Sequence, residues 1–246
     1  MMRHKALQRS SHNRLLVAAL TLGAAALATT APSALTASSP PAALERASEP
    51  HLHQYRAFRR MYARSEKLNQ EAWMDAWTEL KGCSFSYQIV QERGSDAVRN
   101  RVLRALLKRE QELIASGEPA RAELTLDNYS FADQTSGPGV RYVGITPKRN
   151  DVLLVDGRMV LSEDGRELLR VEGVLSKNPS FWTSLVNVIR HYARLDGVRV
   201  PIATESVAKV KLAGMSKLNV RYEYESINGR TVSSAARLTL ASGSTR

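Results

Sequence analysis

The chain has 246 residues, with 35 Lys and Arg against 24 Asp and Glu, a net charge of +11 and one cysteine. The lone Cys83 excludes an internal disulfide and a zinc site built from several cysteine thiolates. Four of the basic residues lie in the first 14 positions, so the excess over the rest of the chain is a modest +7. These charges alternate in sign, which indicates a solvated basic surface and favours no nucleic-acid partner.

Residues 1–28 have the pattern of a cleavable signal peptide. Residues 15–27 form an uncharged apolar stretch that ends in small residues near Ala28, and the segment before it contains only basic charges, at Arg3, Lys5, Arg9 and Arg14. A retained membrane anchor is the alternative, but a span needs about 20 apolar residues. No cysteine lies where a lipid would be attached. We expect a periplasmic or secreted protein, cleaved near Ala28, that is not a lipoprotein.

The remaining chain divides into three parts. Residues 29–50 are rich in Ala, Ser, Thr and Pro, which is typical of a flexible tether. Residues 51–240 are long enough for a single domain with a substantial core. Residues 241–246 are expected to form a disordered tail.

Residues 52–80 place apolar side chains mostly three and four positions apart, which predicts an amphipathic helix. Trp73 and Trp77 then lie one turn apart and either wall a cavity or pack in the core. Alternation from Cys83 to Ile89 predicts a half-buried strand, with Cys83 as a buried apolar residue at its start and no role as a nucleophile.

A second amphipathic helix is expected between Ser95, its cap, and Gly117. Its apolar stripe includes Leu103, Leu106 and Leu107. The opposite face is basic and is either simply solvated or in contact with an anionic membrane or partner; its residues are Arg99, Arg101, Arg104, Lys108 and Arg109.

From residue 140 onward the pattern predicts strands joined by tight turns. Asp-Gly and Asn-Gly between alternating apolar runs are strong hairpin signals, because both residues tolerate a positive φ. Such turns are expected at Asp156-Gly157, Asp164-Gly165, Asp196-Gly197 and Asn228-Gly229. The predicted class is therefore α+β: a large curved antiparallel β-sheet, an incomplete barrel in meander order, capped by two amphipathic helices.

The strand-rich part also resembles a family of uncharacterised secreted bacterial proteins related to the periplasmic lipoprotein carriers, which have the LolA-like fold. The segments that carry this resemblance, over roughly residues 68–230, are Asp151-Val152-Leu153-Leu154-Val155-Asp156-Gly157, Leu169-Arg170-Val171-Glu172-Gly173, Ser176-Lys177-Asn178-Pro179-Ser180-Phe181-Trp182, Gly197-Val198-Arg199-Val200-Pro201 and Tyr222-Glu223-Tyr224-Glu225-Ser226-Ile227-Asn228-Gly229. The resemblance implies a half-barrel capped by helices over a hydrophobic cavity. It transfers no individual binding residue.

No common hydrolase, nucleotide-binding or metalloprotease motif is present in the sequence. His51 and His53 lie beside the tether, and His191 lies within an expected strand without a partner nearby in sequence. Glu223 and Glu225 share one face of an expected strand, as on a solvated face. We expect no enzyme activity, no cofactor and no metal.

The leading hypothesis is a non-enzymatic envelope protein that binds a lipid, acyl chain or other hydrophobic ligand between the helices and the sheet. Its further partners would be envelope lipoproteins or an anionic membrane surface. The alternative is an interaction or sensor module with a solid core, in which Phe181 and Trp182 either form an exposed contact or tuck under the sheet. The candidate cavity residues are Trp73, Trp77, Leu103, Leu106, Leu107, Phe181 and Trp182.

Overall fold

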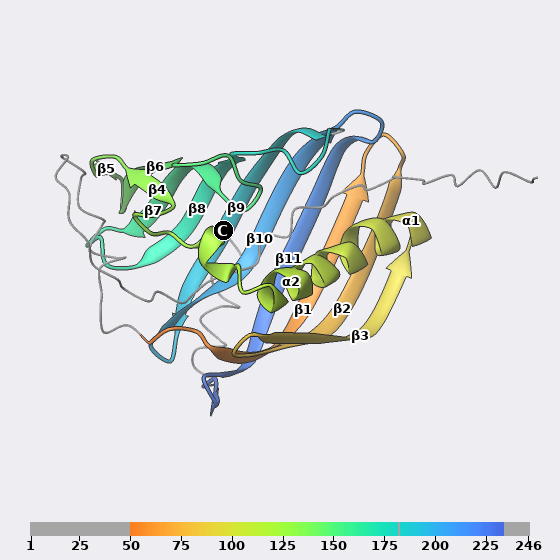
Figure 1. Cartoon of the computed structure of the whole chain (residues 1–246), viewed down its shortest axis with the longest axis horizontal. Helices are drawn as coiled ribbons and strands as arrows, with labels where there is room; N and C mark the ends of the chain where they lie inside the picture. The colour runs from red at the N-terminus through yellow and green to blue at the C-terminus, as the bar shows by residue number, and fades with distance from the viewer. Residues whose placement is uncertain (1–49, 182, 234–246) are drawn as a thin grey trace, which may run out of the picture.

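The computed structural model describes residues 50–181 and 183–233. The expected signal peptide, the tail at 241–246, nearly all of the tether and Trp182 therefore lie outside the described residues. Within them, one twelve-stranded sheet carries a helix on one face (Figure 1). The strands are β1 (Gln54–Ser65), β2 (Gln70–Lys81), β3 (Ser84–Gly94), β4 (Tyr129–Phe131), β5 (Thr135–Gly137), β6 (Val140–Pro147), β7 (Val155–Ser162), β8 (Leu168–Leu175), β9 (Thr183–Leu195), β10 (Val198–Val210), β11 (Gly214–Ile227) and β12 (Arg230–Thr231).

The main path of the sheet runs β3-β2-β1-β11-β10-β9-β8-β7-β6-β4, and every pairing is antiparallel. Strands β6 to β11 follow each other as a meander, and β1 to β3 form a second one. The two halves join where β1 pairs with β11, so meander order holds within each half only. The sheet does not close into a barrel. The predicted large antiparallel sheet is therefore confirmed.

One helix spans residues 96–115 and crosses the face formed by β11, β1, β2 and β3 (Figure 1). It consists of α1 (Asp96–Val98), a π-helical turn η1 (Arg99–Leu103) and α2 (Arg104–Ala115). Its apolar stripe packs on the sheet, as its sequence predicts; we call this covered face the inner face. A short 3₁₀ helix, η2 (Pro119–Ala122), follows. Within the described residues, no helix has the length and apolar character that a membrane span requires.

The helix predicted for residues 52–80 is wrong, because this segment forms the β1–β2 hairpin. Inner-face positions of β1 alternate from Tyr55 to Ala63, but one of them is the buried Arg59. Aromatic residues such as Phe58 occupy outer-face positions of the same strand. A charged residue on the inner face and aromatic residues on the outer face interrupt the two-residue hydrophobic period of a strand. The remaining apolar residues then have a spacing typical of a helix. Among residues 50–181 and 183–233, one helix, and not two, covers the sheet.

The hairpin predicted at Asp156-Gly157 is also wrong, since both residues lie inside β7. Gly157 stands directly opposite Gly173 of β8. A Cβ atom on Gly157 would lie 2.2 Å from the Glu172 carbonyl oxygen, so this glycine permits close contact between backbones. The other three expected turns are present; Asp196 and Gly197, for example, both have positive φ.

Two smaller expectations also differ from the structure. Cys83 is exposed, because it lies in the tight turn between β2 and β3 and not within the strand. The Ser95 side chain does not cap the helix. Its hydroxyl donates to Gln70 Oε1 at 3.2 Å, and the Ser95 carbonyl accepts the Arg99 amide at 2.9 Å.

A buried ion pair joins the helix to the sheet. Arg59 of β1 donates to both carboxylate oxygens of Glu110 in α2, over 2.5 and 2.8 Å, and also to the Tyr55 hydroxyl at 2.6 Å. Both charged side chains are almost inaccessible to solvent. The Arg59 guanidinium also lies 4.7 Å from the centre of the Tyr222 ring. The pair therefore fixes the helix over β1 at one register.

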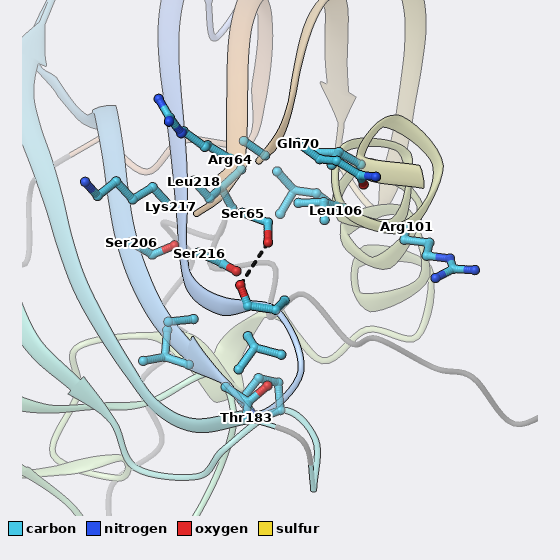
Figure 2. A pocket seen from close by; sticks show the side chains of 18 of the residues that line it. Arg64, Ser65, Gln70, Arg101, Leu106, Thr183, Ser206, Ser216, Lys217 and Leu218 are labelled. Atoms are coloured by element: carbon cyan, nitrogen blue, oxygen red, sulfur yellow. Dashed lines mark hydrogen bonds between the residues drawn. The ribbon is translucent and has the colours of Figure 1, made fainter. Parts of the chain in front are cut away.

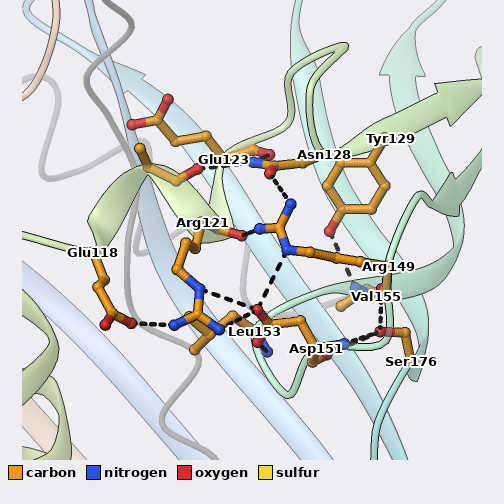
Figure 3. Close-up of polar contacts among 11 residues, drawn as sticks. Glu118, Arg121, Glu123, Asn128, Tyr129, Arg149, Asp151, Leu153, Val155 and Ser176 are labelled. Carbon is orange, nitrogen blue, oxygen red and sulfur yellow. Dashed lines mark hydrogen bonds and ion pairs between the residues drawn. The ribbon is translucent and has the colours of Figure 1, made fainter.

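A second polar cluster holds the loops beside β4 and β6 (Figure 3). The buried Asp151 accepts from Arg121 at 2.6 Å and from the Leu153 amide at 3.1 Å, and Arg149 lies 3.5 Å away. Burial alone raises the pKa of this carboxyl, but the hydrogen bonds and nearby positive charges outweigh it, and the pKa falls below 3.8. The cluster depends on an ionised Asp151.

Replacing Asp151 by asparagine is expected to reduce stability by about 1–3 kcal/mol at pH 7, because the two arginines lose their charged acceptor. A carboxyl with a lowered folded-state pKa stabilises above its ordinary value of 3.8, and this contribution is lost as the pH falls through the folded pKa. Urea unfolding at pH 7 and pH 3 measures both effects: the difference between wild type and Asp151→Asn should shrink at pH 3. The exposed Asp133→Asn serves as the control.

Candidate functional site

The inner face has two hydrophobic clusters, one under the helix and one under the loops before β6. The helix packs directly on the first cluster through Leu103 and Leu107, which are fully buried. Ile114 continues this contact toward the end of the helix. This part of the helix is therefore packed against the sheet through buried apolar side chains.

A pocket of about 160 Å³ lies between the first half of the helix and the adjoining ends of β1, β10 and β11 (Figure 2). Val98, Val102 and Leu106 lie one turn apart and form its helical wall. They belong to a different stripe from Leu103 and Leu107, so one helix face is shared between core packing and the pocket. The opposite wall consists of inner-face side chains from β1, β9, β10 and β11.

Small side chains on the sheet create the space. Positions 204, 206 and 208 of β10 carry Thr, Ser and Ala on the inner face, between the larger Val200 and Val210. Ser216 contributes another small side chain from β11. Because these residues leave their side of the pocket unfilled, a cavity remains where Val or Leu would have completed the core.

Some polar groups around the pocket are engaged by the protein itself, whereas the buried Thr204 hydroxyl has no hydrogen-bond partner among the described residues. The Ser65 hydroxyl donates to the Ala213 carbonyl at 2.9 Å (Figure 2), and the Thr183 hydroxyl lies 3.0 Å from that of Ser180. The described lining residues include no His, Cys, Asp or Glu. The walls are therefore mainly apolar.

Arg190 of β9 carries a positive charge close to the pocket. It stands opposite Thr204 in the β9–β10 pairing and is buried. Burial lowers the pKa of the Arg190 guanidinium, but electrostatic interactions with Tyr192 and Tyr222 raise it by more. The pKa of Arg190 therefore lies above its ordinary value. Burial also raises the pKa of the Tyr222 hydroxyl, which stays neutral at physiological pH. A smaller cavity of about 20 Å³ lies beside Arg190.

The structure separates the candidate residues that the sequence suggested. All three leucines belong to the core cluster, and of these only Leu106 also lines the pocket, unlike Leu103 and Leu107. Trp73 and Trp77 lie on the outer face of β2, opposite Tyr62 and Phe58 of β1, and contribute nothing to the pocket. Phe181 is 80% exposed near the pocket mouth, and Trp182 is outside the described residues.

Sequence reasoning missed the strand residues that form most of the pocket. The available signal was the run of small residues at every second position of β10, Thr204-Ser206-Ala208. A period of two places these side chains on one face, and their small size implies unfilled space if that face is buried. The sequence does not specify which face is buried, since both faces of β10 carry polar residues.

The remaining candidates for chemistry are scattered. His51 and His53 are exposed, and His191 lies 3.6 Å from Glu205 at the partly exposed surface of β9 and β10. Glu223 and Glu225 form exposed ion pairs with Arg60 and Arg56. Among the residues that the structure describes, no cluster of three or more His, Cys, Asp and Glu side chains has the geometry of a metal site.

Comparisons with known proteins provide little further information. No protein-family model matches the chain, and no curated protein matches it. Among solved structures, the chain is similar to a DUF1329 family protein from Desulfovibrio piger ATCC 29098, with 11% sequence identity and a TM-score of 0.32 over 70% of this chain and 84% of that one. This similarity is too distant to support a functional argument. The expected resemblance to the lipoprotein carriers is not shown by these comparisons.

Proposed function

We propose that this protein is a non-enzymatic protein of the cell envelope that binds a hydrophobic ligand in the pocket between the helix and strands β9 to β11. The observation that carries the proposal is the apolar pocket itself, open at the end of the sheet and lined by Val98, Val102, Leu106, Val186 and Val188. A pocket with few polar groups favours binding through apolar burial.

The size of the pocket sets the extent of the ligand that it encloses. An apolar cavity of about 150 Å³ binds benzene, and this pocket measures about 160 Å³. It therefore encloses a small apolar group or the end of an acyl chain, about six carbons, and the rest of a longer lipid would extend through the mouth. Burial of six methylenes contributes roughly 5 kcal/mol.

We also propose that the chain is exported by cleavage near Ala28, on the basis of its basic and apolar N-terminal segment. Cell fractionation followed by mass spectrometry of the N-terminus tests this directly. A cytoplasmic protein that retains residues 1–28 would contradict the proposal for export, but it would leave the proposal for the pocket intact.

Filling the pocket should remove ligand binding without unfolding the protein. Ala208 points into the pocket from β10, and a phenyl ring at this position takes up space comparable to that of benzene. We expect Ala208→Phe to weaken binding of cis-parinaric acid, a fluorescent fatty acid whose chain ends in a free methyl group, at least tenfold. The melting temperature should stay equal or rise, because the added ring fills a cavity.

The matched control is Asn187→Phe, which adds the same ring to the exposed outer face of β9. This variant should bind the probe as the wild type does. Equal probe binding by the wild type and Ala208→Phe would contradict the proposal. Lipid extraction and native mass spectrometry of protein purified from its own envelope should then identify the natural ligand.

The alternative is a protein-interaction or sensor module with a solid core. The directly packed contact between the helix and β1 to β3 favours this candidate, because most of the inner face is filled. The exposed Phe181 would then contact a protein partner. Stable capture of one envelope protein by a chain that binds no probe would support this alternative over the pocket.

A further inference from the structure

Three segments meet around the mouth of the pocket, residues 64–69, 177–181 and 209–217; we call them the rim. The Glu66 amide donates to the Met215 carbonyl at 2.9 Å, which joins the β1–β2 turn to β11. The Lys211 ammonium lies 3.8 Å from the centre of the Phe181 ring, which brings the loop before β9 to the turn after β10. The rim is thus one continuous surface, and Leu68 belongs both to it and to the pocket wall.

The rim combines exposed apolar side chains with positive charge. Leu68, Phe181 and Leu212 are 53%, 80% and 67% exposed. The rim contains six exposed basic residues and one acidic residue, Glu66, which pairs with one of them. The basic residues are Arg64, Lys67, Lys177, Lys209, Lys211 and Lys217. In Figure 2 the side chains of Arg64 and Lys217 extend away from the pocket and toward solvent.

This composition is not typical of the rest of the surface. Eight large apolar side chains are exposed in the described residues, and Leu68, Phe181, Leu212 and Met215, half of them, lie in the rim. Apolar tips surrounded by lysines are the combination that binds the interface of an anionic bilayer: the tips enter the acyl region and the ammonium groups contact lipid phosphates. A merely solvated surface requires the charges but not the apolar tips.

We propose that the rim docks on the surface of an anionic phospholipid bilayer and places the mouth of the pocket against the membrane. The role of this contact, loading and release of a hydrophobic ligand without exposure to water, rests on the proposed function. The contact itself depends only on the rim. Leu68 forms a continuous apolar path from the membrane side into the pocket.

The test is binding of the purified protein to phosphatidylcholine vesicles with or without phosphatidylglycerol, measured by flotation. Wild type, purified from the envelope with its N-terminus checked by mass spectrometry, should bind only the anionic vesicles, and less so at high salt. Because each basic residue near an anionic surface strengthens binding roughly fivefold, reversal of Lys67, Lys177 and Lys211 to Glu should weaken binding about 100-fold or more.

The matched control reverses Lys108, Lys148 and Arg230 to Glu, three exposed basic residues outside the rim. It changes the net charge equally and should retain binding within about threefold. A second variant, Phe181→Ser with Leu212→Ser, should lose about tenfold in a manner that salt does not alter, because it removes only apolar insertion. Circular dichroism and urea unfolding verify that each variant folds.

The two proposals fail in different ways. Ala208→Phe should lose binding of cis-parinaric acid but still bind anionic vesicles, and the rim variant should show the reverse. Equal loss of vesicle binding in the rim and control variants, or no binding by wild type, overturns the membrane proposal. If the wild type binds an envelope protein through the rim but does not bind vesicles, the membrane proposal is also overturned, in favour of a protein partner.

Discussion

Replacing Glu110 by alanine is expected to destabilise the fold by about 3–5 kcal/mol, because it leaves the Arg59 guanidinium charged and buried without its carboxylate. The pKa of Arg59 lies well above its ordinary value: burial opposes the charge, and Glu110 and Tyr55 outweigh burial. Loss of Glu110 therefore removes the main compensation without neutralising the arginine. Urea unfolding followed by circular dichroism measures this change.

Two further variants isolate the cause. Glu112→Ala removes an exposed glutamate from the same helix, 3.4 Å from Arg109, and should change stability by less than about 0.5 kcal/mol. The double replacement Arg59→Met with Glu110→Leu should recover most of the stability lost in Glu110→Ala, since apolar side chains replace a buried pair well. A double variant as unstable as the single one would indicate that Glu110 acts through packing and not through charge.

The second large effect is expected at Gly157, where a valine side chain should cost about 3 kcal/mol or more. The Cβ atom would lie 2.2 Å from the Glu172 carbonyl oxygen and 2.6 Å from the Gly173 Cα atom. Backbone atoms cannot rotate away as a side chain can, so β7 and β8 must separate locally and weaken their hydrogen bonds. Thermal unfolding of Gly157→Val measures the loss.

Gly144 of β6 provides the control for this variant. It stands opposite Arg158 in the same sheet, and a Cβ atom on it meets only the Ala132 methyl group, at 3.1 Å. Gly144→Ala should cost less than about 1 kcal/mol. If Gly157→Val is as stable as Gly144→Ala, the close approach of β7 and β8 is not required for the fold.

Local patterns in the sequence predict much of the second half of the molecule. Strand β11 alternates between buried and exposed side chains over most of its length, and Asp196-Gly197 has the positive φ angles that the hairpin between β9 and β10 requires. The helix is predicted because its apolar stripe has a period of 3.6 residues. These elements depend on neighbouring residues in the chain, so their signals are local.

The errors arise where distant residues decide the structure. Arg59 occupies an inner position of β1 because Glu110, from a helix 51 residues later, neutralises it. Gly157 is in a strand because Gly173 allows two backbones to approach. The pocket requires Leu106 of the helix and Ser206 of β10 to face each other, and no spacing in the sequence encodes this contact. Trp73 is large enough to wall a cavity, but the pairing of β1 with β2 places it on the outer face of the sheet.

The pairing of β1 with β11 has a consequence for how the chain acquires its structure. The His53 amide donates to the Asn228 side chain across 175 residues, and all of β1 pairs with a strand near the other end of the described chain. Loop closure over such a separation is slow. The edge of β1 that faces away from β2 has no partner strand until β11 has been synthesised. A nascent chain therefore cannot complete its sheet during most of its synthesis. Pulse-labelled refolding should detect β1 protection and β11 protection appearing together.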